Sequence, residues 1–218
     1  MEPSRGSAPA GVSALFWSLV TAERLEDAAV LDVGTGSGRI ALGLAPHCRR
    51  VVGIDTDAAA LEEARRRATA TGLTNVEFRS GDADRVEYMD VHPELVTAHL
   101  FMSDALVARA SRALPPGGAL VIVAFHVDQW RETGRPSRFA YDETRMRGVL
   151  DAAGFDVERL EVEREISTFR CLEEALAHVI TFEERWKSDG RWVRYLKFLE
   201  EGGRTLTRCH LVVKARRR

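Results

Sequence analysis

The chain has 218 residues, 45% of them hydrophobic, which is enough to bury one sizeable core. Its 31 basic and 33 acidic residues give a formal net charge of −2. A protein held to nucleic acid mainly through phosphates usually carries a basic excess, so we do not expect a nucleic-acid partner. The basic ending "KARRR" is interpreted as a solvated tail.

Cysteine spacing and hydropathy indicate the cellular compartment in which the protein is expected. Cys48, Cys171 and Cys209 lie too far apart for a zinc-ligand spacing and do not form a disulfide framework. The longest apolar stretch, 119–125, is too short to cross a bilayer. We therefore expect a soluble protein in a reducing, cytoplasmic setting, with no membrane partner and no metal.

Strands are predicted to alternate with helices over the first two thirds of the chain. Residues 1–11 have no apolar periodicity and are predicted to be a flexible tail ahead of a single domain over 12–218. The predicted strands are 28–33, 50–55, one within 75–83, 94–100 and 119–126. The predicted helices are 12–28, 39–47, 56–72, 102–118, 141–155 and 171–200. This alternation favours a parallel sheet with helices on both faces.

The last third of the sequence changes character. Strands are predicted at 156–165 and 205–215. Two segments, 127–141 and 167–204, are interpreted as a substrate-side loop and a helical insertion. The loop mixes aromatic and guanidinium side chains, which suits an anionic or planar ligand, although a solvated loop fits equally well. The aromatic residues within 171–200 fit a lid, ordinary core or a dimer contact.

A glycine-rich turn directly follows the first predicted strand. Gly34, Gly36 and Gly38 form a G-x-G-x-G spacing, with Asp32 two residues before the first glycine. Dinucleotide enzymes place a G-x-G-x-x-G turn at the same point. A carboxylate here is a poor neighbour for a pyrophosphate and a good one for an ammonium or sulfonium group. The turn therefore favours a cationic ligand over a dinucleotide.

Two further acids follow the next strands. Asp55 ends the second strand, where a carboxylate can accept both hydroxyls of a ribose, and Asp82 follows the third. Because the carboxyl ends of parallel strands share one edge, all three acids are expected at the edge where open α/β sheets bind ligands.

Five segments resemble the class I S-adenosylmethionine-dependent methyltransferases. In chain order they are "VLDVGTGSG", "VVGIDTD", "SGDAD", "RALPPGGALVIV" and "LDAAGFDVERLEV", spread over residues 28–165. The resemblance implies an α/β fold with a Rossmann-like seven-stranded sheet, mostly parallel, with helices on both faces. The terminal "HLVVKA" is similar to that family's antiparallel last strand, inserted between the fifth and sixth.

The same resemblance implies S-adenosylmethionine as cofactor and a set of residues around it. The glycine turn would lie under the methionine portion, Asp32 would face the amino group, Asp55 the ribose, and Asp82 the adenine amino group. Asp57 would flank the adenine, but a helix N-cap explains it as well. The cofactor-binding residues implied are Asp32, Gly34, Thr35, Gly36, Gly38, Asp55, Thr56, Asp82, Ala83 and His99.

The residues that would serve the methyl acceptor are less defined. A base is needed only when the acceptor must lose a proton. The segment "VTAHLFMS" lacks the Asn/Asp-Pro-Pro-aromatic motif used on adenine or glutamine nitrogens, and the fourth and fifth strands are not followed by a nucleophilic cysteine. His99 and His126, at strand carboxyl ends, are the candidate catalytic bases, although packing also explains such histidines.

We therefore expect a methyltransferase that uses S-adenosylmethionine on a small-molecule acceptor. An RNA or protein methyltransferase, and a non-catalytic S-adenosylmethionine-binding regulatory protein, stay open as alternatives. A nicotinamide dehydrogenase is disfavoured by the glycine spacing and by "SGDAD". The acceptor atom, the use of a base and the oligomeric state are not decided by the sequence.

Overall fold

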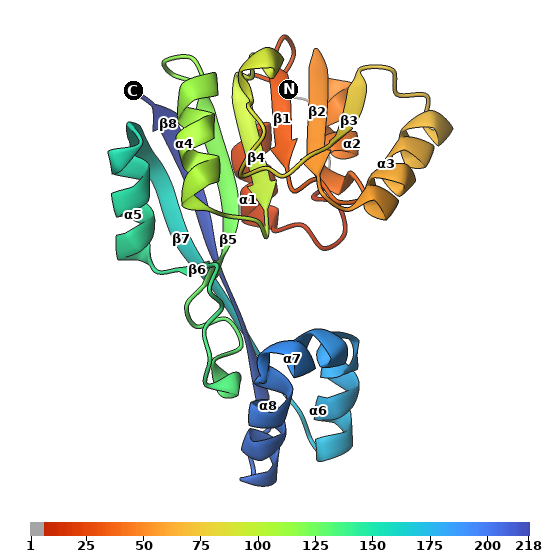
Figure 1. Cartoon of the computed structure of the whole chain (residues 1–218), viewed down its shortest axis with the longest axis vertical. Coiled ribbons are helices and arrows are strands. Elements are labelled where there is room, and N and C mark those ends of the chain that lie inside the picture. Colours follow the sequence, from red (N-terminus) through yellow and green to blue (C-terminus); the bar gives the residue numbers. More distant parts are fainter. Residues whose placement is uncertain (1–6) are drawn as a thin grey trace. The chain divides into compact units, whose positions relative to one another are not determined.

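The computed structural model describes residues 7–218, which form two compact units (Figure 1). The first, here the sheet unit, comprises the described residues up to Ala124 together with Glu143–Glu161 and Val212–Arg218; the second, here the helical unit, comprises Phe125–Asp142 and Val162–Leu211. Residues 1–6 of the predicted tail 1–11 lie outside the described residues. The division into a tail and one domain over 12–218 stays a prediction.

Five parallel strands form the centre of the sheet. They are β1 (Ala29–Val33), β2 (Arg50–Asp55), β3 (Val76–Ser80), β4 (Leu95–His99) and β5 (Ala119–His126). β1 pairs with β2 and β4, β2 also pairs with β3, and β4 pairs with β5. All five residues of β1 are buried, as expected for a central strand covered on both faces.

The two long C-terminal strands, β7 (Phe155–Thr168) and β8 (Thr205–Arg217), complete the order β3-β2-β1-β4-β5-β8-β7. The Gly117 N–H donates to the Arg217 carbonyl and the Arg217 N–H to the Gly118 carbonyl, at 2.7 and 2.9 Å. The end of β8 thus lies beside the start of β5, so β8 is antiparallel. The predicted fold and the insertion of the last strand are confirmed.

The sheet has eight strands rather than the seven expected, because the short β6 (Ala140–Tyr141) pairs with the end of β5. The helices also depart from the expected ranges. α1 (Ala14–Thr21) ends well before residue 28, and Leu25 is buried from the turn that follows. The continuous helix expected over 171–200 is divided into α6 (Leu172–Val179), α7 (Glu183–Asp189) and α8 (Arg191–Glu200), with Gly190 at φ 80° between the last two.

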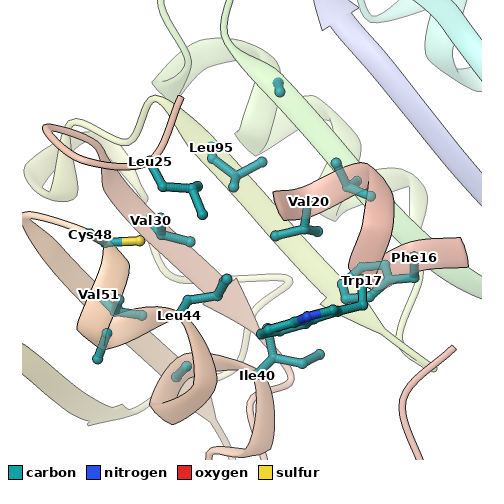
Figure 2. Packing of buried hydrophobic residues seen from close by; sticks show 14 of the residues in the cluster. Phe16, Trp17, Val20, Leu25, Val30, Ile40, Leu44, Cys48, Val51 and Leu95 are labelled. Atoms are coloured by element: carbon teal, nitrogen blue, oxygen red, sulfur yellow. The ribbon is translucent and has the colours of Figure 1, made fainter. Parts of the chain in front are cut away.

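Helices cover both faces of the sheet unit. One face is packed by α1, α2 (Arg39–Leu44) and α3 (Ala58–Ala70), whose apolar side chains meet those of the strands (Figure 2). Phe16, Val20 and Leu44 belong to this cluster and are fully buried. The remaining helices of the unit are α4 (Asp104–Ala113) and α5 (Glu143–Ala152). This packing holds the carboxyl ends of β1 to β4 in a defined order.

The helical unit has its own core. Its buried side chains include Trp130, Trp186, Tyr195 and Leu199. The indole of Trp186 makes edge contacts with Trp130 and Tyr195, with ring centroids 5.1 and 5.6 Å apart, a favourable aromatic geometry. The aromatic residues of 171–200 therefore supply the core of this unit. The helices of the described residues are all too short or too polar to cross a membrane.

Candidate functional site

The glycine turn between β1 and α2 has three residues in the left-handed region, Gly34, Gly36 and Gly38, at φ 70°, 52° and 77°. A side chain would also collide at two of them: a Cβ at Gly34 would lie 2.9 Å from Phe101, and one at Gly38 would lie 2.8 Å from Phe78. At Gly36, apart from the residue itself and its two chain neighbours, the described residues place no heavy atom within 4 Å of that position. Gly36 therefore presents bare backbone to open space, where a ligand can approach the main chain.

The N–H groups of this turn are used within the protein. The N–H groups of Gly34 and Thr35 both donate to the Ile54 carbonyl, at 2.9 and 3.1 Å. The N–H of Gly36 donates to Asp55 Oδ2 at 2.7 Å. An anion-binding turn needs these donors for its ligand. The turn is thus better suited to van der Waals contact with a neutral or cationic group than to binding a diphosphate.

Asp32 is buried in β1 beneath the turn. Only 1% of the residue is exposed, and its carboxylate accepts from Thr35 Oγ1 at 2.6 Å and from Thr97 Oγ1 at 2.9 Å. Burial raises the pKa of this carboxyl to about 6, against the opposing effect of the two hydroxyl donors. A cation placed beside Asp32 would relieve the cost of keeping this carboxylate charged.

Asp55 ends β2 and is half-buried at the same edge of the sheet. One carboxylate oxygen accepts from the Gly36 N–H and the other from the Asp57 N–H, at 2.7 and 2.9 Å. Each oxygen keeps a further lone pair, so the carboxylate can still accept two hydroxyl groups. Asp57 itself caps α3, accepting from the N–H groups of Ala59 and Ala60.

Asp82 lies beyond β3, next in sheet order after β2 and β1. Its side chain is exposed and accepts from the Asp84 N–H at 3.0 Å, and its Oδ2 lies 3.2 Å from Arg85 Nε. The following Ala83 is buried, and its carbonyl accepts from the hydroxyl of the buried Tyr88 at 2.7 Å. Asp32 within β1, Asp55 at the end of β2 and Asp82 after β3 thus belong to three neighbouring strands, and Thr56 is exposed beside Asp55.

His99 ends β4 and contacts the start of α1. Its Nε2 accepts from the Ser13 N–H at 3.2 Å, and its ring meets that of Phe16 at 69°, with centroids 5.3 Å apart. The next residue, Leu100, has φ 61°, a strained value for a residue with a side chain. The sequence placed His99 at the sheet edge but offered no signal for Ser13, which lies 86 residues away.

His126 belongs to the helical unit, in which it is buried at the end of β5. Its Nδ1 accepts from the Asp128 N–H at 3.1 Å. The segment 127–141 is packed rather than solvated along its first part: Trp130 is buried and Glu132 accepts from the Thr207 N–H and hydroxyl at 3.0 and 2.6 Å. Whether His99 or His126 acts as a base stays a prediction.

The sequence of the chain is similar to those of known methyltransferases. A family model described as a methyltransferase domain matches residues 30–118. The chain is 47% identical over 68 residues to mouse tRNA (uracil-5-)-methyltransferase homolog A, covering 31% of this chain and 10% of that protein. It is 30% identical over 179 residues to the release factor glutamine methyltransferase of Xylella fastidiosa, covering 68% and 63%.

A third relative matches in both sequence and structure. The uncharacterized methyltransferase YcgJ of Bacillus subtilis is 32% identical over 109 residues, covering 47% of this chain and 43% of that protein. The crystal structure of YcgJ superposes with a TM-score of 0.71 at 17% identity, covering 94% of this chain and 97% of that chain. The chain spans less than two thirds of the length of each of these three curated relatives.

Solved structures described as S-adenosylmethionine-dependent methyltransferases also share the fold. The matched segment, 30–118, contains the glycine turn and the acids Asp32, Asp55 and Asp82. The resemblance found in the sequence is thereby confirmed: a methyltransferase-domain model matches 30–118, and the chain shares its fold with methyltransferases of known structure, S-adenosylmethionine-dependent ones among them.

Proposed function

We propose that this protein transfers the methyl group of S-adenosylmethionine to a small-molecule acceptor by in-line displacement. The observation that carries the proposal is the bare backbone of Gly36 above a buried carboxylate, Asp32. The N–H groups of Gly34 and Thr35 are already bonded within the protein, which disfavours a phosphate ligand at this turn. A sulfonium ligand needs no such donors.

The residues of the sheet edge fit the parts of this cofactor. Asp32 would attract the ammonium group, and Asp55 would accept from the ribose hydroxyls through the lone pairs left by its two backbone donors. Asp82 would accept from the adenine amino group, with Thr56 and Ala83 beside the ring. The cofactor supplies an electrophilic methyl carbon on a sulfonium sulfur. The leaving group is a neutral thioether and needs no acid. The protein therefore contributes mainly by positioning the reactants and excluding water.

Two observations support a small-molecule acceptor. The net charge of −2 is not that of a protein bound to RNA phosphates. His99 is followed by Leu100-Phe101-Met102, an apolar run without the Pro-Pro motif of enzymes that act on amide or adenine nitrogens. The names of two relatives refer to different acceptors, a tRNA uracil and a release factor glutamine, so they do not favour one class.

His99 would take a proton from the acceptor only after a local change. The Ser13 N–H occupies the Nε2 lone pair that a base would use. We expect His99→Ala to lower kcat by about 100-fold, the lower range for loss of a general base, while leaving cofactor affinity within about threefold. Equal losses in kcat and in affinity would assign His99 to cofactor binding instead.

Calorimetry tests the cofactor assignment directly. We expect S-adenosylhomocysteine to bind the full chain and NAD not to bind. Binding of NAD in preference would overturn the proposal.

Turnover separates the remaining alternatives. The protein is incubated with methyl-labelled cofactor and, in parallel, with a metabolite extract, total RNA and total protein. We expect label to enter the metabolite fraction. Label in RNA or in protein would establish the corresponding alternative, and binding without transfer to any fraction would identify a regulatory S-adenosylmethionine-binding protein.

A further inference from the structure

Three potential metal ligands meet in the helical unit, outside the residues assigned to the cofactor. A ring nitrogen of His126, a carboxylate oxygen of Asp128 and the Sγ of Cys209 all lie within 4.8 Å of one another. His126 and Cys209 are buried, whereas the Asp128 side chain is 36% exposed. The cluster therefore has a closed side and a side open to solvent.

Backbone and side-chain hydrogen bonds hold this cluster together. The Gln129 N–H donates to the His126 carbonyl at 2.9 Å, closing a tight turn at the end of β5. The buried Gln129 side chain then accepts from the Cys209 N–H at 2.6 Å. The next residue, Trp130, donates its N–H to the Thr207 carbonyl at 2.9 Å. The turn is thus fixed to β8 at two points, and Cys209 is held beside His126.

The chemistry of the three donors selects a class of metal ion. A thiolate and an imidazole together favour Zn²⁺ over Mg²⁺ or Ca²⁺, which prefer oxygen ligands. Zn²⁺ binds such atoms at about 2.0–2.3 Å, so tetrahedral donors stand about 3.3–3.8 Å apart. His126 Nδ1 and Asp128 Oδ2 are already 3.7 Å apart, and Zn²⁺ bound at Nδ1 would replace the Asp128 N–H from which this nitrogen accepts. Even the widest pair needs to approach by only about 1 Å to reach this spacing.

The surroundings supply the outer shell that zinc sites use. The Arg164 guanidinium pairs with Asp128 Oδ2 at the exposed side of the cluster, and Gln129 fixes the backbone of Cys209 at the buried side. Carboxylates that bind zinc are commonly hydrogen-bonded in this way through a second donor. One thiolate and one carboxylate offset the charge of Zn²⁺, while Arg164 remains half-exposed to solvent.

From this geometry we propose that His126, Asp128 and Cys209 form a Zn²⁺ site with three protein ligands, whose fourth position faces solvent on the Asp128 side. Three protein ligands and one open position are the arrangement of zinc sites that bind water or a further ligand. The site lies wholly in the helical unit and does not depend on the proposed methyl transfer. No metal is expected from the sequence, since Cys209 is 80 residues from Gln129 and no local spacing signals the site.

Metal titration of the full chain tests this proposal without an activity measurement. The protein is stripped with a chelator and titrated with Zn²⁺ against a chromophoric competitor, and separately with Co²⁺. We expect one Zn²⁺ per chain and, with Co²⁺, a thiolate-to-metal charge-transfer band. Asp128→Asn and Cys209→Ser should each lower Zn²⁺ affinity by more than about 100-fold. Loss of an outer-shell partner costs up to about that much, and these two residues are direct ligands in the proposed site.

The other two cysteines provide matched controls. Cys48 is buried like Cys209, and Cys171 is exposed. Cys48→Ser and Cys171→Ser should keep both the stoichiometry and the charge-transfer band. If Cys209→Ser does not fold, Asp128→Asn decides alone, since its side chain is partly exposed. Binding below half an equivalent, or a band that Cys171→Ser abolishes, would overturn the site.

Discussion

The two compact units assemble their chemically important side chains in different ways. In the sheet unit, Asp32, Asp55 and Asp82 lie in or directly after three neighbouring strands and belong to short contiguous motifs. In the helical unit, His126 and Cys209 come from segments far apart in the chain and meet because β5 and β8 are neighbours in the sheet and the turn after β5 is bonded to β8. Motif reading therefore finds the first kind of site and misses the second.

The units differ in their cores as well. The sheet unit buries aliphatic strands between helices, whereas the helical unit centres on one aromatic cluster around Trp186. A core concentrated in a few large rings depends strongly on each ring, because a single truncation removes many contacts. Five experiments test these contrasts, from the largest expected effect to the smallest.

Trp186→Ala should destabilise the helical unit by about 3–5 kcal/mol, the usual cost of truncating a buried aromatic residue to alanine. Amide hydrogen exchange would report the loss in α6 to α8, while S-adenosylhomocysteine affinity of the sheet unit should be unchanged. Trp186→Phe is the control, since the indole N–H is buried without a hydrogen-bond partner among the described residues and its removal breaks none. A phenylalanine variant as unstable as the alanine variant would contradict this account of the core.

Asp55→Ala should weaken S-adenosylhomocysteine binding by about one to two orders of magnitude, or roughly 1.5–3 kcal/mol for hydrogen bonds to a charged group. Calorimetry measures the effect. Asp57→Ala is the matched control two residues away: it removes the N-cap of α3 and should cost about 1 kcal/mol of stability with a smaller change in affinity. Similar affinity losses in both variants would remove Asp55 from its ribose role.

Cofactor affinity should fall as the pH drops through about 6, because protonated Asp32 no longer attracts an ammonium group. The fall approaches tenfold, or about 1.4 kcal/mol, per pH unit below that value. Asp32→Asn should bind weakly at all pH values and lack this dependence. A wild-type affinity that is flat between pH 5 and 8 (about the range in which this carboxyl titrates) would count against the contact.

The same raised pKa makes stability depend on pH in the opposite direction from cofactor affinity. The folded state binds the Asp32 proton more tightly than the unfolded state, whose carboxyl titrates near 3.8. The contribution of Asp32 to the free energy of unfolding is therefore full below about pH 3.8 and is lost as the pH rises through about 6. Asp32→Asn should remove this part of the pH dependence in denaturant titrations of the ligand-free chain.

The contact between Ser13 and His99 gives the smallest expected effect. Ser13→Ala removes the N-cap bond to the Phe16 N–H and should cost about 1 kcal/mol of stability. Ser13→Pro fits the φ of −57° and also removes the N–H that His99 accepts, for a further cost of about 0.5–1.5 kcal/mol. Thermal unfolding compares the two variants, and equal stabilities would show that the His99 contact contributes nothing.

Most of the fold was predictable because local patterns carried it. Apolar strands, acidic helix starts and the glycine turn each depend on neighbouring residues, and the structure confirms the parallel sheet that they predicted. The break at Gly190 had a signal in the sequence, a glycine at a helix end, but the aromatic periodicity of 171–200 suggested one long helix. The two-residue β6 carries too few residues to produce a recognisable pattern.

The supporting partners of the site were not predictable. Thr97 donates to Asp32 because the register of β1 and β4 pairs these two residues, and strand register is not written in either segment alone. Tyr88 reaches the Ala83 carbonyl through the fold of the intervening loop. Such contacts depend on where several segments finally pack, so a single segment holds no trace of them.

By itself, the sequence determined the order of strands and helices, the glycine turn and the three acids of the sheet edge, since each follows from residues adjacent in the chain. Only the tertiary structure decided that the N–H groups of the turn are used internally, that Asp32 is buried enough to titrate near neutrality, and that Cys209 meets His126. The physical reason is that burial and long-range contact arise from packing of whole elements, after local preferences have been satisfied.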